Sequence, residues 1–274
     1  MKIYFMVLPI IIMLFGCEDV IEVQINDADP QIIIEANISD NYGPHYTYIT
    51  MSTDFYKPNE YEGVSGAEVI IEDNNGFREM LTEISSGKYS TSNILGEAES
   101  QYKMTVNVNR QQYSALSTLP VALKLDSVTA EIDNRGFHND EENPDQYKFD
   151  CYFQDRPGVK DYARFKVYKN GVRVGGNFLY QDRLSDGNYI DYFYFRFDED
   201  DDFFAGDTVT IELITIDLNT FNYFNELNDA IASGNNGGIF GSAAPGNPTN
   251  NWDNGAFGYF GANSVDSYTL IIPE

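Results

Sequence analysis

The 274-residue chain is strongly acidic, because 43 Asp and Glu residues outnumber 17 Lys and Arg residues and give a formal net charge of −26. A chain with this charge is repelled by nucleic acid and by anionic membrane surfaces, which excludes nucleic-acid binding as its function. Aromatic residues make up 15% of the chain, with 20 Tyr and 19 Phe against one Trp, and many stand among Val, Ile and Thr. This composition favours β-strands.

The first sixteen residues have the order of a secretory signal. Lys2 supplies one positive charge, an apolar run follows from Ile3 to Phe15, and Gly16 and Cys17 come next. The apolar run has about 13 residues, whereas a helix that crosses a bilayer needs about 20. We therefore expect residues 1–16 to be removed as a signal peptide.

The end of this signal, Leu14-Phe15-Gly16-Cys17, resembles the lipobox of bacterial lipoproteins. The resemblance implies that the thiol of Cys17 receives a diacylglycerol and the new amino terminus an acyl chain, which together suffice for stable membrane anchoring. The alternative is an ordinary signal peptide followed by a chance cysteine. Residues 17–30 are acidic and lack a sustained apolar face, so we expect them to form a tether.

Short strand candidates follow the tether at close spacing, and turn sequences such as Asp73-Asn74-Asn75-Gly76 separate them. With no helical stretch between them, they predict an immunoglobulin-like β-sandwich over residues 31–120. Its segment 64–76, V-S-G-A-E-V-I-I-E-D-N-N-G, resembles the small sandwich modules related to the carboxypeptidase regulatory domain, which are usually non-catalytic. The candidate strands are residues 32–38, 46–53, 67–72, 77–82, 102–108 and 113–118.

A second domain is predicted from residue 121 to residue 274, because Pro120 ends the preceding strand pattern. Strand candidates make this region mainly β, and we expect a second sandwich-like domain. Cys151 lies on one face of a candidate strand with Phe149 and Phe153, which predicts a buried core thiol rather than a reactive one. The candidate strands are residues 125–132, 147–154, 162–168, 172–180, 189–197 and 208–216.

One helix is predicted in the second domain, over residues 218–231. Asp217 is a suitable N-cap, and apolar residues recur at spacings of three and four along the segment. Residues 233–261 follow as a loop rich in Gly and Asn. A loop of this length is uncommon as a mere connector in a compact domain, so we expect it to be functional.

Three sequence blocks at this end of the chain belong together: D-L-N-T-F-N-Y-F-N-E-L from Asp217, S-A-A-P-G-N-P-T-N-N from Ser242, and N-G-A-F-G-Y-F-G-A from Asn254. With C-E-D-V-I-E-V from Cys17 and P-Q-I-I-I-E-A-N-I-S-D from Pro30, they resemble the DUF4249 lipoproteins of Bacteroidota. The resemblance implies an outer-membrane lipoprotein commonly encoded beside a TonB-dependent transporter, with a role in nutrient uptake. It supplies no catalytic residues.

The acidic pair Glu18-Asp19 resembles the signal that sends lipoproteins of this phylum to the cell surface. A simple charged tether is the alternative interpretation.

The second and third blocks contain the candidate binding residues. Their rings and amides either contact a ligand or partner, or form a plug that covers the end of a sandwich. The candidates are Asn247, Asn250, Trp252, Phe257, Tyr259 and Phe260.

The sequence contains no recognised catalytic motif. Its two histidines, His45 and His138, lie at a turn and in an acidic segment, and G-x-S-x-G, H-E-x-x-H and C-x-x-C are all absent. We therefore expect no enzymatic activity. Because carboxylates are abundant, a surface hydrolase that acts through a pair of acidic residues stays as an unfavoured alternative.

Five consecutive acidic residues, from Asp198 to Asp202, form the densest charged run. Such a run is either solvated or neutralised by a divalent cation, and calcium accepts oxygen ligands flexibly. Asp198, Asp200 and Asp202 are the candidate calcium ligands, although the run lacks the spacing of an EF-hand loop. A solvated turn between two strands is the alternative.

Together these features predict a lipid-anchored outer-membrane protein that assists a TonB-dependent transporter. Its ligand would be a small molecule, a peptide or a glycan. An adhesive or structural surface lipoprotein is the alternative from another functional class.

Overall fold

The computed structural model describes residues 29–53, 61–132, 147–183, 185–195, 197, 203–235 and 246–273. The expected signal peptide, Cys17, His138 and the acidic run from Asp198 to Asp202 lie outside these residues. Within the described ranges, no helix combines the length and the apolar character needed to cross a membrane.

The first part of the chain folds into two facing sheets. One layer contains β1 (Ile32–Ser39), β2 (Tyr46–Met51), β3 (Glu62–Gly63), β6 (Thr82–Ser85) and β7 (Lys88–Ser90). The other contains β4 (Glu68–Asp73), β5 (Arg78–Met80), β8 (Gln101–Val108) and β9 (Gln111–Thr118). The expected strand 77–82 is divided between the layers, because buried Leu81 separates β5, which pairs with β4, from β6, which pairs with β7.

The second part repeats this layered arrangement. Strands β10 (Leu125–Ile132), β11 (Tyr147–Gln154) and β14 (Tyr189–Phe195) form a three-stranded sheet. The opposite layer contains β12 (Tyr162–Lys169), β13 (Val172–Gln181), β15 (Thr208–Thr215) and the last strand, β16 (Phe257–Ile271). The prediction of a mainly β fold with two sandwich-like parts and one helix is confirmed.

The two sandwiches share one sheet, and β16 is the strand that joins them. Its first half pairs in parallel with β1, from Ile33 opposite Phe257 to Ser39 opposite Asn263. Its second half pairs antiparallel with β15. A nine-stranded sheet results, in the order β13-β12-β15-β16-β1-β2-β7-β6 with β3 beside β2. The end of the chain is therefore part of both sandwiches.

The prediction of a loop that extends to residue 261 is wrong, because residues 257–261 begin β16. The glycines that suggested a loop allow close strand pairing instead. Gly258 has a φ of 91°, and a Cβ atom there would lie 2.2 Å from the carbonyl oxygen of Ile34. The helix is also longer than predicted, because α2 runs from Leu218 to Asn235.

Each sandwich has its own hydrophobic core. The first core includes residues from β1, β2, β4, β8 and β9 and also Trp252 and Phe260 from the end of the chain. The second core is aromatic and contains fully buried Phe149, Cys151 and Phe153 in a row along β11. Burial raises the pKa of the Cys151 thiol far above its usual range. The prediction of Cys151 as a buried core residue is confirmed.

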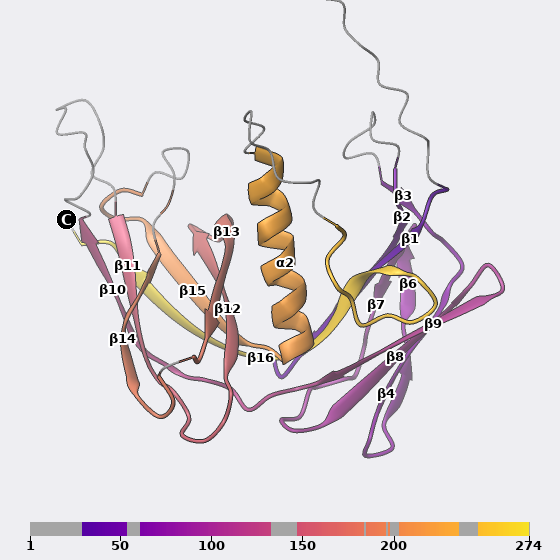
Figure 1. Cartoon of the computed structure of the whole chain (residues 1–274), viewed down its shortest axis with the longest axis horizontal. Coiled ribbons are helices and arrows are strands. Elements are labelled where there is room, and N and C mark those ends of the chain that lie inside the picture. The colour runs from indigo at the N-terminus through magenta and orange to yellow at the C-terminus, as the bar shows by residue number, and fades with distance from the viewer. Residues whose placement is uncertain are drawn as a thin grey trace, which may run out of the picture.

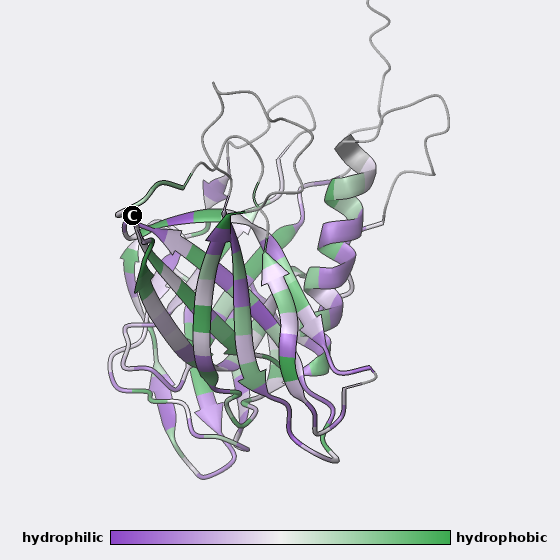
Figure 2. Cartoon of the chain, turned by 90° about the vertical axis from the view of Figure 1, so that its left-hand side faces the viewer, coloured by the Kyte–Doolittle hydropathy of each residue, from purple (hydrophilic) through white to green (hydrophobic). Residues whose placement is uncertain are grey.

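The helix α2 lies between the two sandwiches, on the outer face of the shared sheet (Figure 1). Hydrophobic and hydrophilic residues alternate along the strands of the second sandwich, and α2 stands outside its layers (Figure 2). The apolar contact beneath the helix joins Phe221 to Tyr162, whose ring centroids are 5.1 Å apart, and to Ile214 and Ile216. Beside the helix, sheet residues line open cavities together with residues of α2.

Candidate functional site

The strands around α2 direct alternate side chains away from the two cores. On β12, for example, Phe165 and Val167 are buried in the second core, while Arg164 and Lys166 project on the opposite face. We call the uncovered sheet surface beside α2 the junction face. It consists of Arg164, Lys166, Tyr168, Arg173, Asn177, Glu212, Tyr259, Asn263, Glu35, Asn37, Tyr46 and Tyr48.

Hydrogen bonds at the start and near the middle of α2 hold it against the sandwiches. Asp217 caps the helix, since its Oδ1 accepts a hydrogen bond from the backbone N–H of Thr220 at 2.8 Å. Its Oδ2 accepts one from the hydroxyl of Ser117 at 2.7 Å. Farther along, the Asn228 side chain donates to the backbone carbonyl of Asn177 at 3.0 Å. The predicted N-cap is confirmed, and the same carboxylate also ties the helix to β9.

Substitution of Asp217 by alanine is expected to lower the free energy of unfolding by about 2 kcal/mol, because it removes a helix cap and a part-buried hydrogen bond to β9. Asp217→Asn is the matched control, since asparagine caps helices about as well as aspartate. We expect Asp217→Asn to lower the free energy of unfolding by less than half as much as Asp217→Ala does, measured by urea unfolding with circular dichroism. Equal losses in both variants would contradict a capping role.

Three neighbouring cavities lie along the junction face. The polar cavity, about 260 Å³, is lined by Arg164, Lys166, Thr220 and Asn263 among others. The middle cavity, about 380 Å³, shares Arg164 and Lys166 with it and adds Arg173. These volumes are of the order that small-molecule sites occupy.

The aromatic cavity, about 540 Å³, shares Glu35 and Tyr48 with the middle cavity. Tyr61, Tyr223 and Phe257 contribute rings to its lining. The three cavities therefore form a row, with the polar cavity at one end and the aromatic cavity at the other.

Positive charge is concentrated at the polar end of this row. Arg164 is only 8% exposed, and its guanidinium lies 3.8 Å from the ring centroid of Phe224. Burial lowers the pKa of Arg164. Burial also lowers the pKa of Lys166, and repulsion by Arg164 lowers it further. Both changes mean that burial disfavours the charged forms of these two side chains.

The polar cavity also contains polar atoms with no partner. Among the described residues, Arg164 Nε, Thr220 Oγ1 and Asn263 Oδ1 are buried and make no hydrogen bond. All three residues line this cavity. An unsatisfied buried polar group costs about 1–3 kcal/mol, so three around one cavity indicate that a polar species fits there.

The structure separates the six predicted binding residues into two groups. Trp252 is 6% exposed and Phe260 is fully buried, both in the first core, as the plug interpretation expects. The indole N–H of Trp252 donates to the carbonyl of Ile34 at 2.9 Å. Asn250 is part of the same plug, since its side chain accepts a hydrogen bond from the Trp252 backbone N–H at 3.1 Å. These three residues therefore do not face a ligand site.

The other three predicted residues do line cavities. Asn247 and Phe257 line the aromatic cavity. Tyr259 lines the polar and middle cavities, and its ring centroid is 4.8 Å from that of Phe224. Sequence reasoning missed Arg164 and Lys166, because charged residues that alternate with apolar ones are typical of any solvated strand face.

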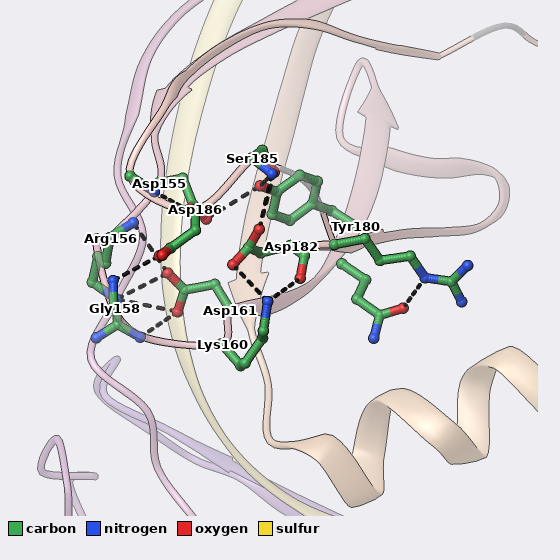
Figure 3. Close-up of polar contacts among 12 residues, drawn as sticks. Asp155, Arg156, Gly158, Lys160, Asp161, Tyr180, Asp182, Ser185 and Asp186 are labelled. Carbon is green, nitrogen blue, oxygen red and sulfur yellow. Dashed lines mark hydrogen bonds and ion pairs between the residues drawn. The ribbon is translucent and has the colours of Figure 1, made fainter.

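A second polar group lies at one end of the second sandwich (Figure 3). Carboxylate oxygens of Asp155, Asp182 and Asp186 lie within 4.8 Å of one another, the spacing of a metal site. Donors from the protein already engage all three. Gly187 N–H donates to Asp155 at 2.9 Å and Gly158 N–H donates to Asp186 at 2.6 Å.

The third carboxylate of this group, that of Asp182, also accepts hydrogen bonds from the protein. The backbone N–H and the hydroxyl of Ser185 both donate to Asp182 at 3.2 Å, and Lys160 lies 3.5 Å away. Beside it, Arg156 forms an ion pair with buried Asp161. These contacts join the turn at residues 155–161 to residues 182–183 and 185–187, so a structural role accounts for the group.

The sequence matches the family model described as "Domain of unknown function (DUF4249)" over residues 18–269, and no curated protein matches it. The matched region contains both sandwiches, α2 and nearly all of β16. It therefore includes every residue of the junction face. The chain thus belongs to the DUF4249 family.

Proposed function

We propose that this protein is a lipid-anchored binding protein of the bacterial outer membrane, which captures a ligand on the junction face and acts with a TonB-dependent transporter. The observation that carries the binding role is the row of three cavities beside α2, with buried polar atoms that lack partners at one end. A small molecule, or an end group of a peptide or glycan, is of the right size for these cavities.

The membrane role is supported by the amino-terminal sequence. Leu14-Phe15-Gly16-Cys17 resembles a lipobox, and an acylated Cys17 would hold the folded part at the membrane surface. No catalytic residues enter the proposal, since binding alone accounts for the cavities.

Lipidation is tested by growing expressing cells with labelled palmitate. We expect the wild-type protein to carry the label and Cys17→Ala to carry none. Cys151→Ala is the matched control, because it removes the other cysteine and should leave labelling unchanged. Labelling of the Cys17→Ala variant would contradict an anchor at this position.

The partnership is tested by cross-linking in native membranes, followed by purification of the tagged full-length protein. We expect an outer-membrane transporter with a TonB-dependent signature to co-purify with the wild-type protein and much less with the unanchored Cys17→Ala variant. Recovery of no such transporter from the wild type would refute this part of the proposal. The ligand-binding part of the proposal would not be affected by that result, because it is tested by ligand binding and not by co-purification.

A further inference from the structure

We propose that the polar and middle cavities of the junction face together form a binding site for a small organic anion, one that carries a carboxylate or a phosphate beside hydroxyl or amine groups. This inference rests on the proposed binding role and names the class of ligand. It comes from the charges, the unpartnered atoms and the shape of these cavities.

The charge distribution is the first argument. The chain as a whole has 43 acidic against 17 basic residues, yet the middle cavity is lined by Arg164, Lys166 and Arg173 and only one carboxylate, that of Glu35. Within the described ranges, none of these three cations has a carboxylate within ion-pair distance, whereas Arg156, Lys148 and Lys169 elsewhere do. Local positive charge on a strongly acidic protein favours an anionic guest.

The arrangement of Arg164 is the second argument. One of its nitrogens, Nη2, donates to Asn177 Oδ1 at 2.6 Å, and the guanidinium stacks on Phe224. These two contacts fix the plane of the guanidinium before any ligand arrives. Its Nε is buried and has no hydrogen-bond partner in the described part of the chain. A planar guanidinium held in this way is well suited to a carboxylate or phosphate.

The remaining unpartnered atoms define the rest of the ligand. Asn263 Oδ1 can only accept a hydrogen bond, while Thr220 Oγ1 can donate or accept. The exposed fractions of Asn263 and Thr220 are only 4% and 2%, so bulk solvent does not reach their side chains freely. A ligand with a hydroxyl or amine donor near its anionic group would satisfy both residues.

The walls of the middle cavity limit the body of the ligand. Tyr46, Tyr48 and Tyr259 contribute rings to it, and such rings favour the flat or apolar faces of a small organic molecule. The polar cavity also contains the carboxylate of Glu212, which lies opposite Lys166 on β15 and accepts a hydrogen bond from the hydroxyl of Tyr168 at 3.0 Å. Among the described residues, Glu212 forms no ion pair with Arg164, so it does not occupy the guanidinium.

The test uses inorganic phosphate and acetate as probes of the two candidate anionic groups, with chloride at equal ionic strength as the reference. Binding to the full-length, detergent-solubilised protein is measured by calorimetry. We expect at least one probe to bind with a dissociation constant in the millimolar range, typical of a fragment-sized ligand. The probe that binds more tightly distinguishes a phosphate-bearing ligand from a carboxylate-bearing one.

Two variants and one control locate the site. Arg164→Gln and Lys166→Gln should each weaken binding of the preferred probe by about tenfold or more, because each removes a charged donor. Arg183→Gln changes an exposed arginine outside these cavities and should bind as the wild type does. Because Lys166 is only partly buried, its variant keeps the test valid if Arg164→Gln fails to fold.

Failure of both probes to bind the wild type beyond the chloride reference would overturn the proposed anion site. Equal weakening of probe binding by Arg183→Gln and Lys166→Gln would also overturn it, because the probe affinity would then depend on the net charge of the protein and not on these cavities. The transporter proposal stands or fails separately, since it is decided by co-purification. Anion binding without a transporter refutes only the partnership, and a transporter without anion binding refutes only the ligand class.

Discussion

Replacement of Trp252 by alanine is expected to lower the free energy of unfolding by about 3–5 kcal/mol, the usual cost of removing a large aromatic side chain from a core. The indole is 6% exposed, packs in the first core with its ring centroid 6.4 Å from that of Phe260, and donates to the carbonyl of Ile34. Because Trp252 is the only tryptophan, unfolding in urea must be followed by circular dichroism rather than by fluorescence.

Two controls separate the causes of this loss. Trp252→Phe keeps most of the buried ring but removes the N–H donor to Ile34, and should cost about 1–2 kcal/mol. Tyr42→Ala removes an aromatic ring that is 90% exposed, and should change stability by less than about 0.5 kcal/mol. If Trp252→Ala were as stable as Tyr42→Ala, the indole would not be a core residue and the ligand-surface interpretation would return.

The parts of the fold that follow local rules were predictable from the sequence. Alternation along β11 placed Phe149, Cys151 and Phe153 on one buried face, as the structure confirms. The N-cap at Asp217 also follows from neighbouring residues alone. The same holds for the hairpin turn between β12 and β13, where Asn170-Gly171 is a dipeptide typical of two-residue turns. Both residues of that turn have positive φ, at 50° and 82°, as a type I′ turn requires.

The shared sheet could not be predicted in this way. It depends on pairing between β1 and β16, where Ile33 lies opposite Phe257, far away in the sequence. Local periodicity does not show which distant strand a segment pairs with. In addition, the glycines in residues 255–261 gave that segment the composition of a loop. The plug was expected as one of two interpretations, but its hydrogen bonds, in which the Asn251 side chain donates to the carbonyl of Phe260 and accepts from its N–H, were not.

The candidate site was only partly predictable for a related reason. Asn247, Phe257 and Tyr259 belong to conspicuous sequence blocks, and they do line cavities. Arg164 and Lys166 lie on β12, whose alternation resembles that of any half-exposed strand. They differ from other exposed strand residues because α2 covers part of this face and partly buries them. The contact of α2 with β12 exists only in the folded chain, so the sequence pattern of β12 does not report it.

Gly258→Ala is expected to destabilise the protein by about 3 kcal/mol or more, because the residue combines positive φ with a very close backbone approach. A Cβ atom at this position would lie 2.2 Å from the carbonyl oxygen of Ile34. That oxygen also accepts the hydrogen bond from the Trp252 indole. Relief of the clash must therefore disturb either the pairing of β1 with β16 or the packing of the indole.

Gly255→Ala is the matched control, because Gly255 also has positive φ, at 78°, but a Cβ there would meet no atom within 4 Å. It should cost about 1 kcal/mol, the penalty for an alanine in the left-handed region. The difference between the two variants in urea unfolding measures the steric part alone. Equal costs would mean that β1 and β16 do not approach as closely as described. If Gly258→Ala destabilises the protein more than Gly255→Ala and also weakens binding of the anion probe, the pairing of β1 with β16 shapes the junction face. Glu35 on β1 and Tyr259 on β16 are register partners in this pairing, and both belong to the junction face.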